Sequence, residues 1–158
     1  YANTTGSNNT AAGIYSLFAN TEGDKNTAIG YSLYANTTGD DNIGMGYNAL
    51  AANTTGTRNI AIGNSALIAP DTENDNLAIG YDALGGAIAG GEYNVAIGNY
   101  SLDANTSGDN NVGVGYEALS GNTTGTRNIG IGNNALDAAD TENDNLGIGY
   151  DALGESIH

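Results

Sequence analysis

The sequence predicts an all-β protein, a parallel β-solenoid of about nine coils, and three observations support that prediction. A nine-residue pattern, seen clearly at residues 42–50, recurs along nearly the whole chain of 158 residues. Its apolar positions stay in register from copy to copy. The copies begin every 16 to 18 residues, mostly every 17, at Asn26, Asn42, Asn59, Asn76, Asn94, Asn111, Asn128 and Asn145, with a degenerate copy at Asn9. A fixed period of this length is typical of a solenoid in which each repeat is one coil.

The first element of each repeat is a short alternation of large and small residues. Ile43 and Met45 flank Gly44, and later copies read Ile60-Ala61-Ile62 and Val112-Gly113-Val114. Alternation with a period of two predicts a strand with the branched residues on one face. We expect the branched face to fill the coil, and the small residues to face another sheet or protomer. Helix is disfavoured because Gly or Asn recurs every few residues and no stretch has apolar residues at 3.6-residue spacing.

The remaining elements of the repeat are a corner, a leucine contact and a turn. A glycine such as Gly46 follows each strand and marks a corner where positive φ or a close backbone approach is expected. The leucine that comes next, such as Leu50, is expected to pack beside the branched pair of the strand. Asn-Thr-Thr-Gly segments then predict turns through their Asn and Gly content, and they begin at Asn36, Asn53 and Asn122.

Stacking of coils at about 4.8 Å converts each repeat position into a column along the rod. The repeat asparagines are expected to form a ladder in which the side-chain amides hydrogen-bond to one another and to turn backbone. The position before them alternates in charge, so that Arg58 lies between Asp41 and Asp75, and Arg127 is followed by Asp144. We interpret this column as ion pairs that set the register on a solvated surface.

Composition excludes several classes of function. Eighteen acidic residues against three basic ones give a formal charge of −15, which repels nucleic acids and anionic membrane surfaces. No apolar run is long enough to predict a membrane-inserted segment. Cysteine is absent, which excludes disulfides and thiolate sites. The single histidine, His158, cannot complete a catalytic triad or a histidine-based metal site, so we expect no enzyme.

Two sets of residues are candidate binding sites. Tyrosines that follow the corner glycine can stack on sugar rings, anchor a protein partner or simply pack along the rod. These are Tyr31, Tyr47, Tyr81, Tyr116 and Tyr150. Two acidic turns place oxygen atoms at alternate positions, as a calcium ion prefers, or are only solvated. Their candidate ligands are Asp71, Glu73, Asp75, Asp140, Glu142 and Asp144. No other cofactor is expected.

The segments 26–30, 59–63 and 94–98 read Asn-x-Ala-Ile-Gly and resemble the head repeats of trimeric autotransporter adhesins. They are also similar to bacteriophage tail-fibre repeats. The resemblance implies a left-handed parallel β-roll, a homotrimer exposed on a cell surface or virion, and attachment to a host or cell-surface protein or glycan. The 17-residue coils are longer than is typical of adhesin heads.

We therefore expect residues 1–158 to form one solenoid domain, as a segment of a longer fibre or as a filament subunit. The expected function is that of an extracellular, non-enzymatic structural or adhesive fibre segment that associates with itself. One alternative is a filament assembled end to end through open coils. The other is an ice-binding solenoid, which requires a flat, regular threonine face, whereas Thr37 and Thr54 fall in turns and the series is interrupted at Asp71.

Overall fold

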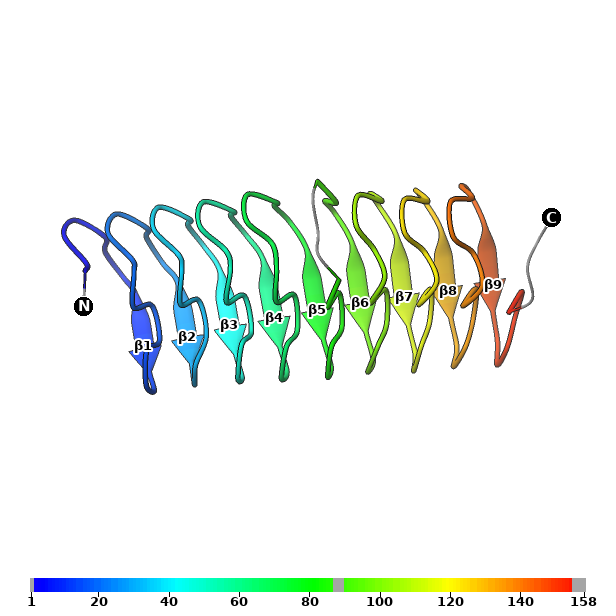
Figure 1. Ribbon diagram of the computed structural model, residues 1–158, viewed down its shortest axis with the longest axis horizontal. Helices are drawn as coiled ribbons and strands as arrows, with labels where there is room; N and C mark the ends of the chain where they lie inside the picture. Colours follow the sequence, from blue (N-terminus) through cyan, green and yellow to red (C-terminus); the bar gives the residue numbers. More distant parts are fainter. Residues whose placement is uncertain (1, 87–89, 155–158) are drawn as a thin grey trace.

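The computed structural model describes residues 2–86 and 90–154, and within these ranges the chain forms nine parallel strands and no helix. Each strand pairs with the next in sequence, so the sheet order is the chain order. The strands are β1 (Thr10–Ala12), β2 (Thr27–Ile29), β3 (Ile43–Met45), β4 (Ile60–Ile62), β5 (Leu77–Ile79), β6 (Val95–Ile97), β7 (Val112–Val114), β8 (Ile129–Ile131) and β9 (Leu146–Ile148). The coils stack into a rod with β1 and β9 at opposite ends (Figure 1). The predicted β-solenoid is confirmed.

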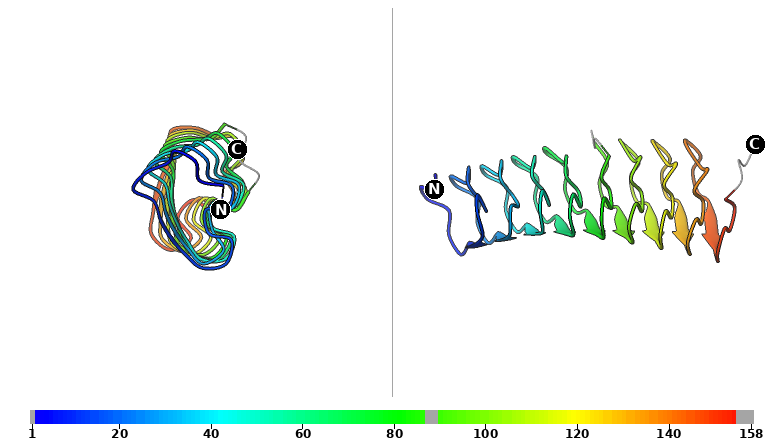
Figure 2. Two further views of the ribbon diagram at one scale, coloured as in Figure 1. Left: turned by 90° about the vertical axis from the view of Figure 1, so that its left-hand side faces the viewer. Right: turned by 60° about the horizontal axis from the view of Figure 1, so that its bottom comes forward.

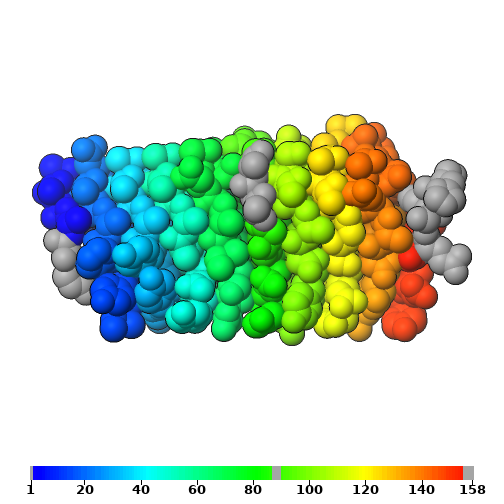
Figure 3. Space-filling model, in the orientation of Figure 1, coloured from blue at the N-terminus to red at the C-terminus, as the bar shows by residue number. Residues whose placement is uncertain are grey.

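The register between strands is uniform along the rod. Ile43 pairs with Ile60, and Gly44 pairs with Ala61, so like positions of the repeat lie side by side. In the end-on view of Figure 2 the coils superpose with a gradual rotation from one end to the other. Figure 3 shows the same coils as successive bands across the surface. At about 4.8 Å per strand, β1 and β9 lie roughly 38 Å apart.

The small middle residue of each strand points into the coil, and the branched pair points out. Ala28 and Ala61 are fully buried, as are the leucines that close the interior: Leu33, Leu50, Leu67, Leu84, Leu102, Leu119 and Leu136. A β-carbon on Gly44 would lie 3.2 Å from Cγ of Leu33 and 3.3 Å from the carbonyl oxygen of Ala49. The interior has no room for a second large side chain. The expectations that Ile and Val pairs fill the coil and that the small residues face another protomer are therefore wrong.

Each coil turns its corner through left-handed backbone. Gly63 has φ of 138°, and a β-carbon there would lie 2.2 Å from the carbonyl oxygen of Gly80, which excludes any side chain. Leu50 also has positive φ, at 53°. That conformation costs roughly 1–2 kcal/mol, and full burial of a leucine offsets it with about 2 kcal/mol. A residue branched at the β-carbon would be more strained, which favours leucine at this position.

The repeat asparagines form the predicted ladder through the buried side of the rod. The N–H of Asn59 donates to Oδ1 of Asn42 at 2.9 Å, and Nδ2 of Asn42 donates to the carbonyl of Gly56 at 2.8 Å. Both asparagines are fully buried. An unpaired buried amide costs about 1–3 kcal/mol, so a slip of one coil against the next is disfavoured. The ladder is confirmed, and it fixes the stacking of the coils.

A second asparagine ladder runs through the turns and is interrupted. Nδ2 of Asn53 donates to Oδ1 of Asn36 at 2.7 Å, in the preceding coil. The next coil has Pro70 at this position, and Oδ1 of Asn53 is buried without a hydrogen-bond partner among the described residues. The ladder resumes at Asn105 and Asn122. The ladder ends again at Ala139, which takes the asparagine position in the second acidic turn.

Glu73 replaces part of what Pro70 removes. It occupies the place that glycine has in the regular turns, as Glu142 does in the second acidic turn, and is 6% exposed. Its Oε2 accepts the N–H groups of Asp71 at 2.8 Å and Thr72 at 3.1 Å. Its Oε1 accepts the N–H of Gly90 at 2.8 Å. The carboxylate therefore holds its own turn and ties it to the next coil.

Candidate interaction surfaces

The outward side chains of the strands form one apolar surface, which we name the aliphatic face. It consists of Thr27, Ile29, Ile43, Met45, Ile60, Ile62, Leu77, Ile79, Val95, Ile97, Val112, Val114, Ile129, Ile131, Leu146 and Ile148. Ile29, Ile62 and Ile131 are each close to 40% exposed. No member of the face is charged, and the strands lie along one side of the rod (Figures 1 and 2). A continuous exposed apolar surface marks an interaction site in a folded protein.

The alternating charges form the predicted ion pairs between adjacent coils. Arg58 donates from Nε to Oδ1 of Asp75 at 2.6 Å and from Nη2 to Oδ2 at 2.7 Å. The guanidinium hydrogen bonds lower the pKa of the Asp75 carboxyl. Arg127 and Asp144 repeat this geometry and lower the pKa of Asp144 in the same way. Lys25 and Asp41 form a looser pair at 3.9 Å, so all three basic residues of the chain are paired.

The six candidate calcium ligands are engaged elsewhere. Asp71 accepts the hydroxyl of Thr54, Glu73 accepts backbone N–H groups, and Asp75 pairs with Arg58. The second acidic turn repeats these contacts through Asp140, Glu142 and Asp144. Within the described ranges, no three acidic or histidine side chains lie close enough together to hold a metal ion. The structure therefore does not bring the predicted ligands together, and His158 lies outside the described residues.

The predicted tyrosines lie along the edge of the rod at which the strands end. Tyr47 is 60% exposed and Tyr150 is 82% exposed, with Tyr81 and Tyr116 also exposed and Tyr31 half-buried. They do not form an unbroken column, because the repeat places asparagine at the same position in other coils, as Asn64, Asn99 and Asn133. Four of them, Tyr31, Tyr47, Tyr81 and Tyr116, instead join other aromatic side chains in two separate groups, and Tyr150 is in neither.

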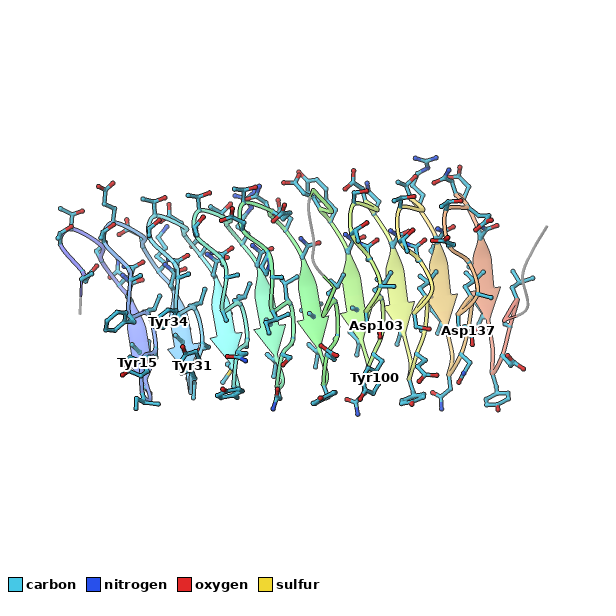
Figure 4. The ribbon with its side chains drawn as sticks, in the orientation of Figure 1. Tyr15, Tyr31, Tyr34, Tyr100, Asp103 and Asp137 are labelled. Carbon is cyan, nitrogen blue, oxygen red and sulfur yellow. The ribbon has the colours of Figure 1, made fainter. Side chains whose placement is uncertain are left out.

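The first group, which we name the aromatic cluster, consists of Tyr15, Phe18, Tyr31, Tyr34 and Tyr47. Phe18 stacks on Tyr34 with ring centroids 5.4 Å apart and planes 4° apart. Tyr31 also stacks on Tyr34, with ring centroids 5.4 Å apart and ring planes 11° apart. Tyr15 is nearly perpendicular to all three of these rings, at 77° to 88°. Figure 4 shows Tyr15, Tyr31 and Tyr34 gathered at the β1 end of the rod.

The second group, the tyrosine–carboxylate cluster, consists of Tyr81, Tyr100, Tyr116, Asp82, Asp103 and Glu117. Tyr100 meets Tyr81 and Tyr116 edge-on, with centroids 5.3 Å and 6.1 Å apart. Partial burial, and then the charges of Asp82 and Glu117, raise the pKa of Asp103. Figure 4 places Tyr100 and Asp103 in the half of the rod toward β9. The two clusters therefore differ in electrostatic character.

Four of these aromatic residues were missed because they stand in other columns of the repeat. Tyr15 and Tyr100 lie two residues before the buried leucine, and Phe18 and Tyr34 lie directly after it. The sequence does contain the necessary information. Aromatic residues from all the columns that lie at one edge of the rod have to be considered together. The column after the corner glycine alone contains only part of each cluster.

The threonines of the turns are used between coils. The hydroxyl of Thr37 donates to the carbonyl of Thr54 at 3.0 Å. In the same way, the hydroxyl of Thr106 donates to the carbonyl of Thr123 at 2.9 Å. The first threonine of these turns therefore does not offer a free hydroxyl to a threonine face. The geometry therefore favours the aliphatic face and the aromatic cluster as interaction surfaces.

Two hollows border the first coil. One, of about 340 Å³, is lined by Gly13, Ile14, Tyr15, Ser16 and Phe18. The other, of about 170 Å³, is lined by Asn3, Asn9, Ala11, Leu17 and Asn20.

None of the described segments is a helix with the length and apolarity needed to cross a membrane. Comparisons of the chain with models of protein families, with curated proteins and with solved structures found no match.

Proposed function

We propose that the chain is a non-enzymatic fibre segment whose copies associate side by side through the aliphatic face, outside the cell, in a structural or adhesive role. The aliphatic face is the observation that supports this proposal. Its residues pair in register from β2 to β9, which gives a continuous apolar strip that rotates gradually along most of the rod. Burial of apolar surface is the main favourable term in protein association.

The partner that best matches this strip is another copy of the same chain. The strip presents one pair of side chains per coil, at a spacing of about 4.8 Å. A partner with the same period can interdigitate along the whole length, whereas a globular partner meets only part of it. The chain has a net charge of −15, but no residue of the aliphatic face is charged. Contact between two such faces therefore buries no carboxylate. Like-charged copies repel each other elsewhere on the surface.

The assembly that we propose is a homotrimer, in agreement with the resemblance of the Asn-x-Ala-Ile-Gly repeats to trimeric fibres. The aliphatic face lies at its axis, in place of the small-residue column, which is inside the coil. The tyrosine edge then remains outside for contact with a host or cell-surface molecule. Attachment through that edge and an extracellular location, on a cell surface or virion, are parts of the same proposal.

The test is the molecular mass of the soluble chain and of two matched pairs of lysine variants. Ile62→Lys with Val114→Lys places two charges on the aliphatic face. Thr38→Lys with Thr124→Lys places two charges on exposed turns and serves as the control. Light scattering should give an oligomer for the parent and the control, and a monomer with an unchanged β-sheet circular dichroism spectrum for the face variant. A parent chain that is monomeric at every concentration contradicts the proposal.

End-to-end assembly is the alternative. It would use β1 and β9, the edge strands of the described sheet, because unpaired strand edges can template pairing with another chain. Deletion of residues 1–9, the first of which lies outside the described ranges, should abolish filaments seen by electron microscopy and leave the coils folded. An intact chain that forms no filaments at any concentration excludes this alternative.

A further inference from the structure

The aromatic cluster has more aromatic surface than its internal packing uses. Tyr15 contacts Phe18, Tyr31 and Tyr34, yet 49% of Tyr15 and 42% of Phe18 are exposed. The ring centroids of Tyr47 and Tyr31 are 5.5 Å apart, and Tyr47 is 60% exposed. Rings that are packed on one side and open on the other are available to a ligand with flat apolar faces. Large aromatic side chains dominate the energetics of such contacts.

The three segments that carry the cluster, residues 14–19, 31–35 and 47–52, contain no charged residue. Burial raises the pKa of Tyr31, and its electrostatic neighbours are Tyr34, Tyr47 and Tyr15, with no carboxylate and no basic group among them. In the tyrosine–carboxylate cluster, by contrast, the pKa of Tyr100 is raised by burial and then by Tyr81 and Asp82. The segments that form the aromatic cluster therefore offer a ligand no charged side chain of their own. The net charge of −15 disfavours anionic ligands at any site on the chain.

Four of the five rings carry a phenolic hydroxyl, which can donate and accept hydrogen bonds. The cluster thus combines ring faces with hydroxyl groups at their tips, and it presents rings from three successive coils: Tyr15 and Phe18 from the first, Tyr31 and Tyr34 from the second, and Tyr47 from the third. Pyranose sugars have the complementary chemistry, with C–H groups on their faces and hydroxyls around their rims. A chain of sugars can lie across several coils.

We propose that the aromatic cluster binds a neutral carbohydrate chain, and that it is the attachment site on the tyrosine edge. The proposal rests on the attachment role given above and specifies its ligand as an uncharged glycan. The proposal does not extend to the tyrosine–carboxylate cluster, in which Tyr100 meets Tyr81 and Tyr116 only edge-on, whereas the aromatic cluster has two stacked pairs.

The repeat itself supplies substitutions that remove rings without disturbing the coil. Tyr15 has φ of 58°, and the same column contains Asn48 and Asn134 at 61° and 57°. Tyr47 stands in the column that has asparagine in other coils, as in Asn64. The double variant Tyr15→Asn with Tyr47→Asn therefore keeps residues that this backbone already accommodates. Asparagine is also among the residues that best tolerate left-handed backbone.

The matched control removes two rings from the other cluster. Tyr100 has φ of 60° and stands in the column of Tyr15, and Tyr116 stands in the column of Tyr47. The double variant Tyr100→Asn with Tyr116→Asn therefore makes the same chemical changes at the same repeat positions. Any general effect of losing two tyrosines on folding or association appears equally in both variants.

The experiment measures binding of neutral oligosaccharides of glucose, galactose and N-acetylglucosamine to the full chain by calorimetry and by saturation-transfer NMR. We expect binding by the parent and the control, and a loss of about tenfold or more in affinity for the Tyr15→Asn, Tyr47→Asn variant. Saturation transfer should reach the ring protons of the sugar, because they lie against the tyrosines.

Two results overturn the proposal. They are no binding of any neutral oligosaccharide by the folded parent chain, and an equal loss of affinity in the control variant. Light scattering on the same samples reports self-association independently. An oligomer that binds no sugar contradicts only the carbohydrate site, whereas a monomer that binds sugar contradicts only side-by-side association.

Discussion

A β-carbon on Gly44 would lie 3.2 Å from Cγ of Leu33, which belongs to the preceding coil. The leucine of one coil and the middle strand residue of the next thus share one narrow space. That contact decides which face of the strand is inside. Because the leucine already fills the interior, only glycine or alanine fits opposite it, and the larger residues of the strand must lie outside.

The first prediction is that Gly44→Val destabilises the rod although valine favours strands. Overpacking of a filled interior costs about 1–3 kcal/mol. Gly44→Ala should cost less, since Ala28 and Ala61 occupy the same column. Urea unfolding followed by circular dichroism measures both. The control is Ile43→Val on the same strand, which faces outward and should change stability only slightly.

The second prediction concerns Asp103, whose pKa is raised above the ordinary value of 3.8. The folded state holds this proton more tightly than the unfolded state, so lowering the pH from neutrality toward 3.8 should increase stability. The pKa values of Asp75 and Asp144 are lowered from 3.8, so these two groups change the stability below pH 3.8 and not between neutrality and that pH. Urea midpoints at about pH 7 and about pH 4.5 should differ less in Asp103→Asn than in the parent. An equal rise in both chains would contradict the assignment.

The period and the type of each element were predictable from the sequence. Asn42 and Asn59 mark successive coils, the three residues after each form the strand, and the glycine that follows has positive φ. A period of two also identified the two faces of each strand. It did not identify the inner face, because alternation is the same whichever side is buried. The size of the space beside Leu33 decides that, and this space exists only after the coils have stacked.

The surface sites were predictable only in part. The partners Arg58 and Asp75 follow from one column and one spacing, and they pair as expected. The acidic turns do not bring their carboxylates together, because Glu73 is turned toward backbone N–H groups. A sequence pattern counts oxygen atoms without showing which hydrogen bonds already use them. The aromatic cluster combines three columns, so it emerges only when the path of the coil brings Tyr15, Phe18 and Tyr31 together.

The third prediction tests the ion-pair column. Arg58→Gln removes both hydrogen bonds to Asp75, so the pKa of Asp75 should rise toward 3.8. A lowered folded-state pKa stabilises the fold above 3.8, and that contribution is lost as the pH falls through the folded value. NMR titration of the carboxyl carbon measures the change. Asp144 is an internal control, because Arg127 is untouched and its pKa should stay low. Both pairs are solvent-exposed, so high salt should reduce the effect on stability.

The last prediction concerns the interrupted ladder at Pro70 and Glu73. In the regular turns, an asparagine and a glycine occur three residues apart, and a β-carbon on Gly56 would lie 2.4 Å from Oδ1 of Asn53. The asparagine and a side chain at the glycine position therefore exclude each other. Pro70 removes the asparagine and admits Glu73, whose carboxylate accepts three backbone N–H groups.

This exclusion predicts opposite effects for single and double substitutions. Glu73→Gly should destabilise the rod by about 1–3 kcal/mol, because it leaves N–H groups without their acceptor. Pro70→Asn alone should also destabilise it, because the new amide collides with the retained glutamate. The double variant Pro70→Asn, Glu73→Gly restores the regular turn and provides a donor for the unpaired Oδ1 of Asn53. It should be at least as stable as the parent, so a double-mutant cycle in urea should give a coupling energy that is opposite in sign to the sum of the two single losses and at least as large. Additive losses would show that the two positions do not compensate each other.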